Sequence, residues 1–237
     1  MKILGIDSSG LVASAALAVD DTLVGEFTVN NQKTHSQTLL PMIDELLRFS
    51  GISLQEIDAI AIAAGPGSFT GLRIGSSTAK GMALALKVPI VPVPTLAGLA
   101  YRLAAADGVI CPIMDARRNQ VYTALFTPSQ GKLHCIREQE AVDIMDILQK
   151  INEIGQKVTF LGDGVPVHRQ AILENIEVEC LFAPLHVSRQ SAASVAALGR
   201  QYFEEGRYES AESHKPIYLR KSQAEREREE RLAAQEK

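Results

Sequence analysis

Short apolar runs alternate with polar turns along the first part of the chain. The apolar run at 2–7 ends in Asp7, and apolar stretches at 13–19 and 23–29 follow it, separated by the two aspartates at 20–21. Runs of this length between turn residues are typical of β-strands. This pattern predicts a strand followed by a hairpin.

Helical periodicity begins after this hairpin. At 34–50 the apolar residues return every three or four positions, which places them along one face of a helix, and the glycine at 51 favours a helix end there. Residues 70–86 form a second predicted helix, between apolar strands at 58–64 and 88–93. The first part of the chain is therefore predicted to be a mixed α/β unit.

The second part of the chain repeats this plan. Its predicted elements are, in order, a strand at 108–115 that ends in Asp115, hairpin strands at 121–126 and about 133–138, a helix at about 141–151, a strand at 157–161, a further helix, a strand at 178–182 and a helix at about 190–206. In both parts a glycine-containing turn follows the fourth strand, at 65–67 and at 162–164. The repeat predicts the duplicated actin-like fold of sugar kinases and the Hsp70 ATPase, an RNase H-like architecture with two mixed-sheet subdomains.

This repeat also sets the expected domain boundaries. We expect an N-terminal subdomain at 1–105, a C-terminal subdomain at 106–213 and a charged tail at 214–237. The helix at about 190–206 is a candidate to pack back on the first subdomain. In the tail, pairs such as Glu227 and Arg231 have the spacing of ion pairs within a helix, which predicts a solvated helix.

Composition narrows the class of protein. The 237 residues include 46% hydrophobic ones, enough to bury a sizeable core, and the net charge is −4. No cluster of four or more Lys and Arg occurs, so we expect a partner to supply the positive surface for any RNA contact. Three cysteines without a C-x-x-C pair argue against a disulfide framework or a zinc site. The sequence shows no signal-peptide pattern, and its longest apolar run, residues 88–100, is too short to span a bilayer. We therefore expect a cytoplasmic protein without a membrane span.

The glycine turn at 65–67 fits neither of two common phosphate-binding motifs. A Walker A loop requires Gly-Lys after its four variable residues, and the dinucleotide fingerprint requires glycine where Thr70 stands. Backbone N–H groups at 68–70 could still receive an anion at the helix N-terminus, as in any strand-turn-helix unit.

The helix at 70–86 has a row of small residues. Gly71, Gly75, Ala79 and Ala83 recur at every fourth position and share one face. Each glycine inside a helix costs roughly 1 kcal/mol relative to alanine. Close packing must offset that cost, either inside the domain or against a partner subunit. Both interpretations stay open.

The helix at 34–50 leaves the same choice. Its apolar stripe includes Leu39, Ile43, Leu46 and Leu47, and Phe49 adds apolar surface beyond the stripe. One sheet covers only one side of such a helix. The other side is either buried within the chain or covered by a partner.

Several segments of the chain resemble bacterial TsaB (YeaZ) proteins, and the similarity runs to about Lys221. The segments are MKILGIDSS, HSQTLLPMIDELL, GPGSFTGLRIG, MDARRNQVYTALF and KPIYLR. This family is paralogous to TsaD, which attaches threonylcarbamoyl to the tRNA adenosine beside the anticodon. The resemblance implies a non-catalytic subunit that works with TsaD and the ATPase TsaE, and reaches tRNA through their complex.

The resemblance also implies where the partner binds. In the family the two helices pair with those of TsaD in a four-helix bundle, and the same surface allows a homodimer when TsaD is missing. The residues expected at this interface are Leu39, Ile43, Leu46, Leu47, Gly71, Leu72, Gly75 and Ala79.

The chain departs from TsaD at the metal site. TsaD has an H-x-x-x-H pair there, whereas this chain has Thr95 and Leu99, neither of which replaces an imidazole ligand. Its five histidines form no i, i+4 pair. We therefore expect no catalytic residue, no metal and no cofactor.

The nucleotide cleft is expected to be vestigial. Asp7 and Asp115 occupy positions where actin-like ATPases hold metal-bound phosphates, but Asp163 interrupts the Gly-Gly of TsaD-like sequences. Arg118, beside Arg117, could bind an anion, although two arginines in a polar hairpin turn also serve solubility. Two alternatives remain. An ATP-dependent kinase of this fold would bind Mg-ATP through Asp7 and Asp115, and a metallopeptidase would need the missing metal ligands.

Overall fold

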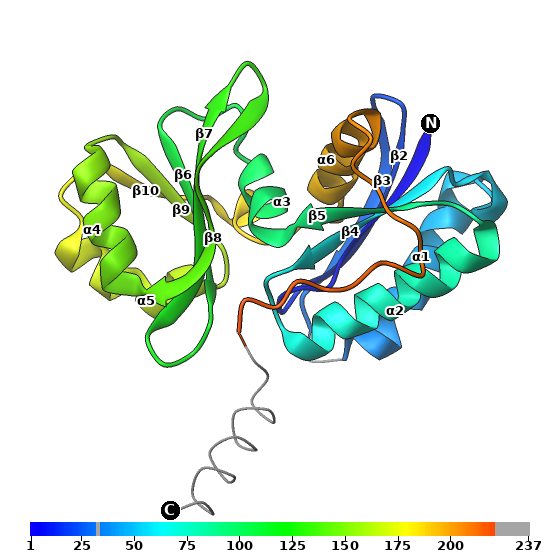
Figure 1. Ribbon diagram of the computed structural model, residues 1–237, viewed down its shortest axis with the longest axis horizontal. Helices are drawn as coiled ribbons and strands as arrows, with labels where there is room; N and C mark the ends of the chain where they lie inside the picture. The colour runs from blue at the N-terminus through cyan, green and yellow to red at the C-terminus, as the bar shows by residue number, and fades with distance from the viewer. Residues whose placement is uncertain (32–33, 221–237) are drawn as a thin grey trace, which may run out of the picture.

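The computed structural model describes residues 1–31 and 34–220 of the chain (Figure 1). The first half contains β1 (Lys2–Asp7), β2 (Ala13–Val19), β3 (Thr22–Val29), α1 (His35–Ser50), η1 (Leu54–Glu56), β4 (Ala59–Gly65), α2 (Phe69–Leu86), β5 (Ile90–Pro94) and α3 (Thr95–Tyr101). The second half contains β6 (Val109–Asp115), β7 (Gln120–Ser129), β8 (Lys132–Asp143), α4 (Ile144–Ile154), β9 (Val158–Leu161), α5 (Gly164–Asn175), β10 (Cys180–Phe182), η2 (Leu185–Val187) and α6 (Ala192–Glu204).

These strands form two five-stranded mixed sheets that lie side by side (Figure 1). The strand orders are β3-β2-β1-β4-β5 and β10-β9-β6-β7-β8. In the first sheet β1 runs antiparallel to β2 and parallel to β4, so that Leu4 lies opposite both Leu17 and Ile60. In the second sheet β6 has the same relation to β7 and β9. The predicted duplicated α/β fold is confirmed.

Helices cover both faces of the first sheet (Figure 1). Helices α1 and α2 pack on one face. Helix α6, which follows the second sheet in the chain, returns to the other face and packs on β1, β2 and β4. Gly199 permits this close approach, because a Cβ at that position would lie 2.3 Å from the Cβ of Ala61.

The two halves share a core at α3, which lies between the sheets (Figure 1). Leu96 and Leu99 of α3 are fully buried among residues of both sheets, including Val93 and Ile110. The periodicity of the sequence did not predict this short helix. Its first six residues are all buried, so no polar face marks it.

The N-terminus of α4 also differs from the expectation of about 141. Strand β8 continues to Asp143, whose carboxylate accepts a 2.9 Å hydrogen bond from the backbone N–H of Met145. Asp143 therefore caps α4, which begins at Ile144.

Residues 207–220, here called the strap, run back along the first half. Glu209 exchanges two backbone hydrogen bonds of 2.9 Å with Ile90 at the edge of β5. Ile217 donates from its backbone N–H to the carbonyl of Ala64 at 2.7 Å. The solvated helix predicted beyond residue 220 lies outside the described residues. Within 1–31 and 34–220, no helix has the length and apolar character needed to cross a membrane.

Candidate functional site: the cleft between the halves and the outer faces of α1 and α2

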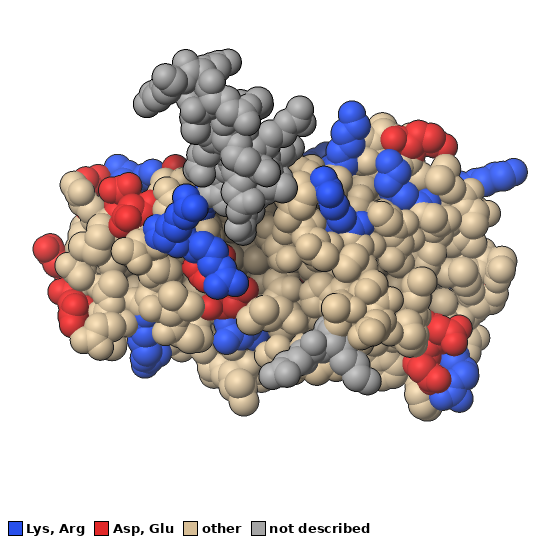
Figure 2. Space-filling view, turned by 90° about the horizontal axis from the view of Figure 1, so that it is seen from below, with Lys and Arg blue, Asp and Glu red and all other residues tan. Residues whose placement is uncertain are grey.

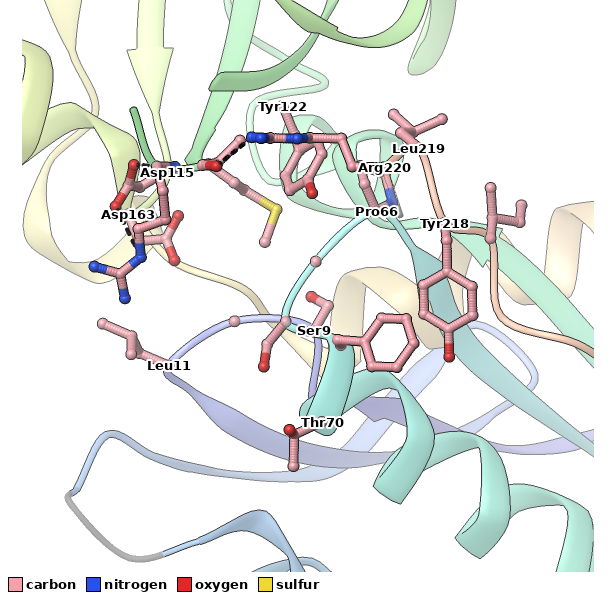
Figure 3. Close-up of a pocket in the computed structure, with 18 of the residues that line it drawn as sticks. Ser9, Leu11, Pro66, Thr70, Asp115, Tyr122, Asp163, Tyr218, Leu219 and Arg220 are labelled. Carbon is pink, nitrogen blue, oxygen red and sulfur yellow. Dashed lines mark hydrogen bonds and ion pairs between the residues drawn. The ribbon is translucent and has the colours of Figure 1, made fainter. Parts of the chain in front are cut away.

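A cleft of about 690 Å³ opens between the two halves (Figure 3). Its first wall consists of the turn after β1 and the loop that leads into α2. Its second wall consists of the end of β6 and the start of α5. The end of the strap also lines the cleft. The three carboxylates that the sequence places near this cleft are Asp7, Asp115 and Asp163.

Asp7 lies at the carboxyl end of β1, where it is 1% exposed. One of its carboxylate oxygens accepts hydrogen bonds from the backbone N–H of Ser9 at 2.9 Å and from the Ser9 hydroxyl at 2.6 Å. Burial raises the pKa of Asp7 to about 6, although the two bonds from Ser9 oppose that shift. Asp7 therefore fixes the turn after β1.

Asp115 holds the turn between β6 and β7. Its carboxylate accepts a 2.8 Å hydrogen bond from the backbone N–H of Arg117, and the Arg117 Nε lies 3.8 Å from its other oxygen. Three consecutive residues of this turn, Arg117, Arg118 and Asn119, have positive φ angles of 66°, 57° and 58°. The side chain of Arg117 is 88% exposed, so its charge faces solvent at the cleft.

Asp163 precedes α5 and lines the second wall of the cleft. Burial raises its pKa, and the positive charge of Arg189 opposes that shift. Its Oδ1 is buried, and no hydrogen-bond partner for it lies within the described part of the chain.

The two loops on the first wall touch each other. The backbone N–H of Ser68 donates to the carbonyl of Ser9 at 2.7 Å, and a Cβ at Gly67 would lie 2.3 Å from that same oxygen. The Ser68 hydroxyl in turn accepts from the N–H of Gly71. Two of the N–H groups near the start of α2 are therefore engaged within the protein, and the space between the loops is filled.

The two positions expected to correspond to the TsaD histidines lie inside the protein. Thr95 and Leu99 are both fully buried on α3, and the Thr95 hydroxyl accepts a 3.1 Å hydrogen bond from the N–H of Gly65. Across residues 1–31 and 34–220, no group of three or more His, Cys, Asp or Glu side chains is placed to hold a metal ion.

The eight residues expected at the partner interface are all buried in the chain itself. They are Leu39, Ile43, Leu46, Leu47, Gly71, Leu72, Gly75 and Ala79. A Cβ at Gly71 would lie 2.1 Å from the carbonyl oxygen of Ser8, and one at Gly75 would lie 2.2 Å from the Ser8 hydroxyl. The row of small residues therefore lets the turn after β1 pack closely against α2. This is the internal-packing interpretation of the row. The expectation that this row faces a partner requires correction.

The opposite faces of α1 and α2 are exposed. Leu84 on α2 and Leu40 on α1 are 50% and 54% exposed. Beyond its chain neighbours and the adjacent backbone of α2, Gly81 on the outer side of the helix has no described atom within 4 Å of the position where a Cβ would stand. We call these surfaces the outer helical faces. The helical period groups residues by face, but it could not say which face of α2 meets the sheet.

The duplicated mixed sheets with a cleft between them define the class of actin-like ATPase folds. The ROK hexokinase from Thermus thermophilus shares this fold with a TM-score of 0.50, at 11% identity over 87% of this chain and all of that chain.

The chain belongs to the TsaB family within this class. The family model of TsaD, tRNA N6-adenosine threonylcarbamoyltransferase, matches residues 23–228. The tRNA threonylcarbamoyladenosine biosynthesis protein TsaB of Bacillus subtilis is 34% identical over 95% of this chain and 96% of its own length. A Pseudomonas aeruginosa protein described by its similarity to the peptidase YeaZ superposes with a TM-score of 0.81, at 27% identity over 92% of this chain and 99% of that chain.

Proposed function

We propose that this chain is a non-catalytic subunit of tRNA threonylcarbamoyl transfer. It pairs with the transferase TsaD through the outer helical faces and acts together with TsaE. Membership of the TsaB family supports the pathway, since the TsaB relatives that match nearly the whole chain are named tRNA threonylcarbamoyladenosine biosynthesis proteins and not transferases. The observation that carries the non-catalytic role is the burial of Thr95 and Leu99 in the shared core.

The contact between the loops of the first wall favours the same role over the kinase alternative. An ATPase of this fold holds phosphates beside these loops, and here the bond from Ser68 to Ser9 closes the space between them. The carboxylate of Asp7 accepts hydrogen bonds from Ser9 and thereby stabilises the turn after β1. A metallopeptidase would need at least three ligands around one ion, and the described residues bring no three candidate ligands together.

The outer helical faces have the features that helix pairing needs. On α2, Ser77 and Gly81 are small and exposed, which lets the backbone of a neighbouring helix approach closely, and Leu84 adds apolar surface at 50% exposure. An exposed apolar surface on helices favours association, either with TsaD or with a second copy of this chain. Contacts with tRNA are then made by the complex.

Leu84→Asp is the variant that tests this interface. It places a charge on the outer face without touching the core, so we expect loss of TsaD binding in sedimentation velocity or calorimetry. Leu173→Asp on α5 is the matched control, because Leu173 is also a helical leucine and is 55% exposed. TsaD binding that survives Leu84→Asp unchanged, or that Leu173→Asp reduces equally, would contradict the assignment.

A further inference from the structure

The mouth of the cleft combines aromatic rings with cations. The guanidinium of Arg73 lies 4.1 Å from the ring centroid of Phe69, and the ring of Phe69 lies 4.4 Å from that of Tyr218 at an interplanar angle of 31°. Phe69 and Tyr218 both line the cleft, and Tyr218 is 39% exposed (Figure 3). The wall on this side therefore contains two adjacent aromatic rings, with a guanidinium over one of them.

These two rings have a fixed position. Phe69 is the first residue of α2, and Tyr218 follows Ile217, whose backbone N–H is bound to Ala64 of β4. A Cβ at Gly65 would lie 2.1 Å from the carbonyl of Ile217, so the strap is seated directly on the end of β4. Rings held in place before a ligand arrives lose little freedom on binding, which favours stacking of a planar group.

The facing wall supplies positive charge at a cost in backbone energy. Arg117 and Arg118 adopt the left-handed conformation, which costs roughly 1 kcal/mol or more per residue for a side chain other than glycine. Neither side chain is in the core. Strain of this kind at an exposed turn points to a functional use of the residues that bear it.

Asp115 offsets part of that charge, because its second carboxylate oxygen lies 3.8 Å from the Arg117 Nε. Asp115 is engaged with the N–H of Arg117, Asp7 with Ser9, and Asp163 lies in the field of Arg189. Figure 2 shows Lys and Arg side chains on both sides of the hollow between the halves. Because the side chain of Arg117 is 88% exposed and that of Asp115 only 23%, the arginine is the more accessible of these two charges to an anion.

We propose that the cleft mouth binds an unpaired nucleotide of a single-stranded RNA segment. Its base stacks on the exposed ring of Tyr218 beside Phe69, and its phosphates contact Arg117, which lines the cleft, and Arg118, the next residue of the same exposed turn. Aromatic rings and arginines lining one groove are the combination by which proteins hold single-stranded RNA. The volume of about 690 Å³ suits a group of nucleotide size. This inference rests on the proposed function, since it gives the TsaB-like subunit its own contact with tRNA.

The test is binding of a short fluorescent single-stranded RNA to the full chain, followed by anisotropy across a salt series. Stacking of one base contributes about 1–3 kcal/mol, so Tyr218→Ala is expected to weaken binding by about tenfold or more. Arg117→Glu with Arg118→Glu is expected to reduce the slope of log K against log salt by about 1.4, for two lost phosphate contacts on a single strand.

Two control variants are matched to these changes. Tyr208→Ala removes a tyrosine that is 51% exposed and stacks on Phe203, away from the cleft. Lys132→Glu reverses a charge at the exposed turn between β7 and β8, at the other end of β7 from Arg117. Both controls are expected to bind the RNA as the parent chain does.

Three results would overturn the inference. The first is the absence of RNA binding at low salt, or equal losses in the control and test variants. The second is displacement of the RNA by Mg-ATP that Asp7→Asn abolishes, which would assign the cleft to free nucleotide. The third is equal competition by poly-glutamate, which would assign it to an acidic protein.

Binding of TsaD to Tyr218→Ala separates this inference from the proposed function. Retained TsaD binding with lost RNA binding supports both. If the parent chain fails to bind TsaD while RNA binding still depends on Tyr218, the partner role is contradicted and the RNA site is supported.

Discussion

Alanine at two glycines of α2 provides a direct test of which face of this helix packs inside. Gly71→Ala places a methyl group 2.1 Å from the carbonyl oxygen of Ser8, whereas Gly81→Ala places one with no described atom within 4 Å apart from its chain neighbours and the adjacent helix backbone. Both substitutions gain about 1 kcal/mol of helix propensity, because each replaces a glycine inside the same helix. The difference between the two variants therefore isolates the cost of the contact with Ser8.

That cost follows from the rigidity of the turn after β1. Ser8 precedes Ser9, which is bonded to Asp7 through both its N–H and its hydroxyl and to Ser68 through its carbonyl. Overpacking against a fixed neighbour typically costs 1–3 kcal/mol. We expect Gly81→Ala to be more stable than the parent chain by up to about 1 kcal/mol. Gly71→Ala should lie below Gly81→Ala by about 1–3 kcal/mol.

Thermal and urea unfolding followed by circular dichroism measure this difference. For a chain of this size each kcal/mol corresponds to about 2–4 °C in Tm. Equal stability of Gly71→Ala and Gly81→Ala would refute the placement of the small-residue row against Ser8. A destabilised Gly81→Ala would refute the assignment of Gly81 to the outer face.

Three further substitutions test other parts of the structure. Because the pKa of Asp7 is about 6 in the folded chain, above its usual range, the folded state binds this proton more tightly and loses stability as pH rises from about 4 to about 6. Asp7→Asn should thus be more stable than the parent above pH 6, by up to about 3 kcal/mol. Urea titrations should show this gain disappearing by about pH 4, and a constant difference across this pH range would contradict the prediction. Asp143→Ala should lose about 1 kcal/mol through the missing cap of α4, and Asp146→Ala, in the same helical turn, is its control. Phe160→Ala should lose about 3–5 kcal/mol, since this ring is fully buried in the second half, and a loss below 1 kcal/mol would be inconsistent with that core.

The order of strands and helices could be predicted because each element has its own periodicity. The stripe of Leu39, Ile43 and Leu46 marked α1, and the duplicated order of the strands marked the fold. Helix α3 was not predicted because nearly all of it is buried, so its sequence lacks the alternation of apolar and polar residues on which prediction depends. The boundary between 105 and 106 stays a prediction.

The site was harder to predict from sequence than the fold. Small residues at every fourth position of α2 indicate a close approach, but the approaching group is Ser8, sixty-three positions from Gly71 in the chain. The contact between Phe69 and Tyr218 joins the start of α2 to the strap, which are far apart in the sequence, so no local pattern predicts it. Arg118 was a candidate because it stands in a turn with a second arginine, and its place in the cleft stays a prediction; its left-handed conformation became visible only in the structure.

Reconstitution of threonylcarbamoyl transfer tests the central claim most directly. Purified TsaD, TsaE and threonylcarbamoyl-adenylate are combined with tRNA, with and without this chain, and a parallel reaction contains this chain as its only protein. We expect modified tRNA only where this chain and TsaD are both present. Modified tRNA from this chain alone would contradict it, because Thr95 and Leu99 would then stand beside a catalytic site that the proposal denies.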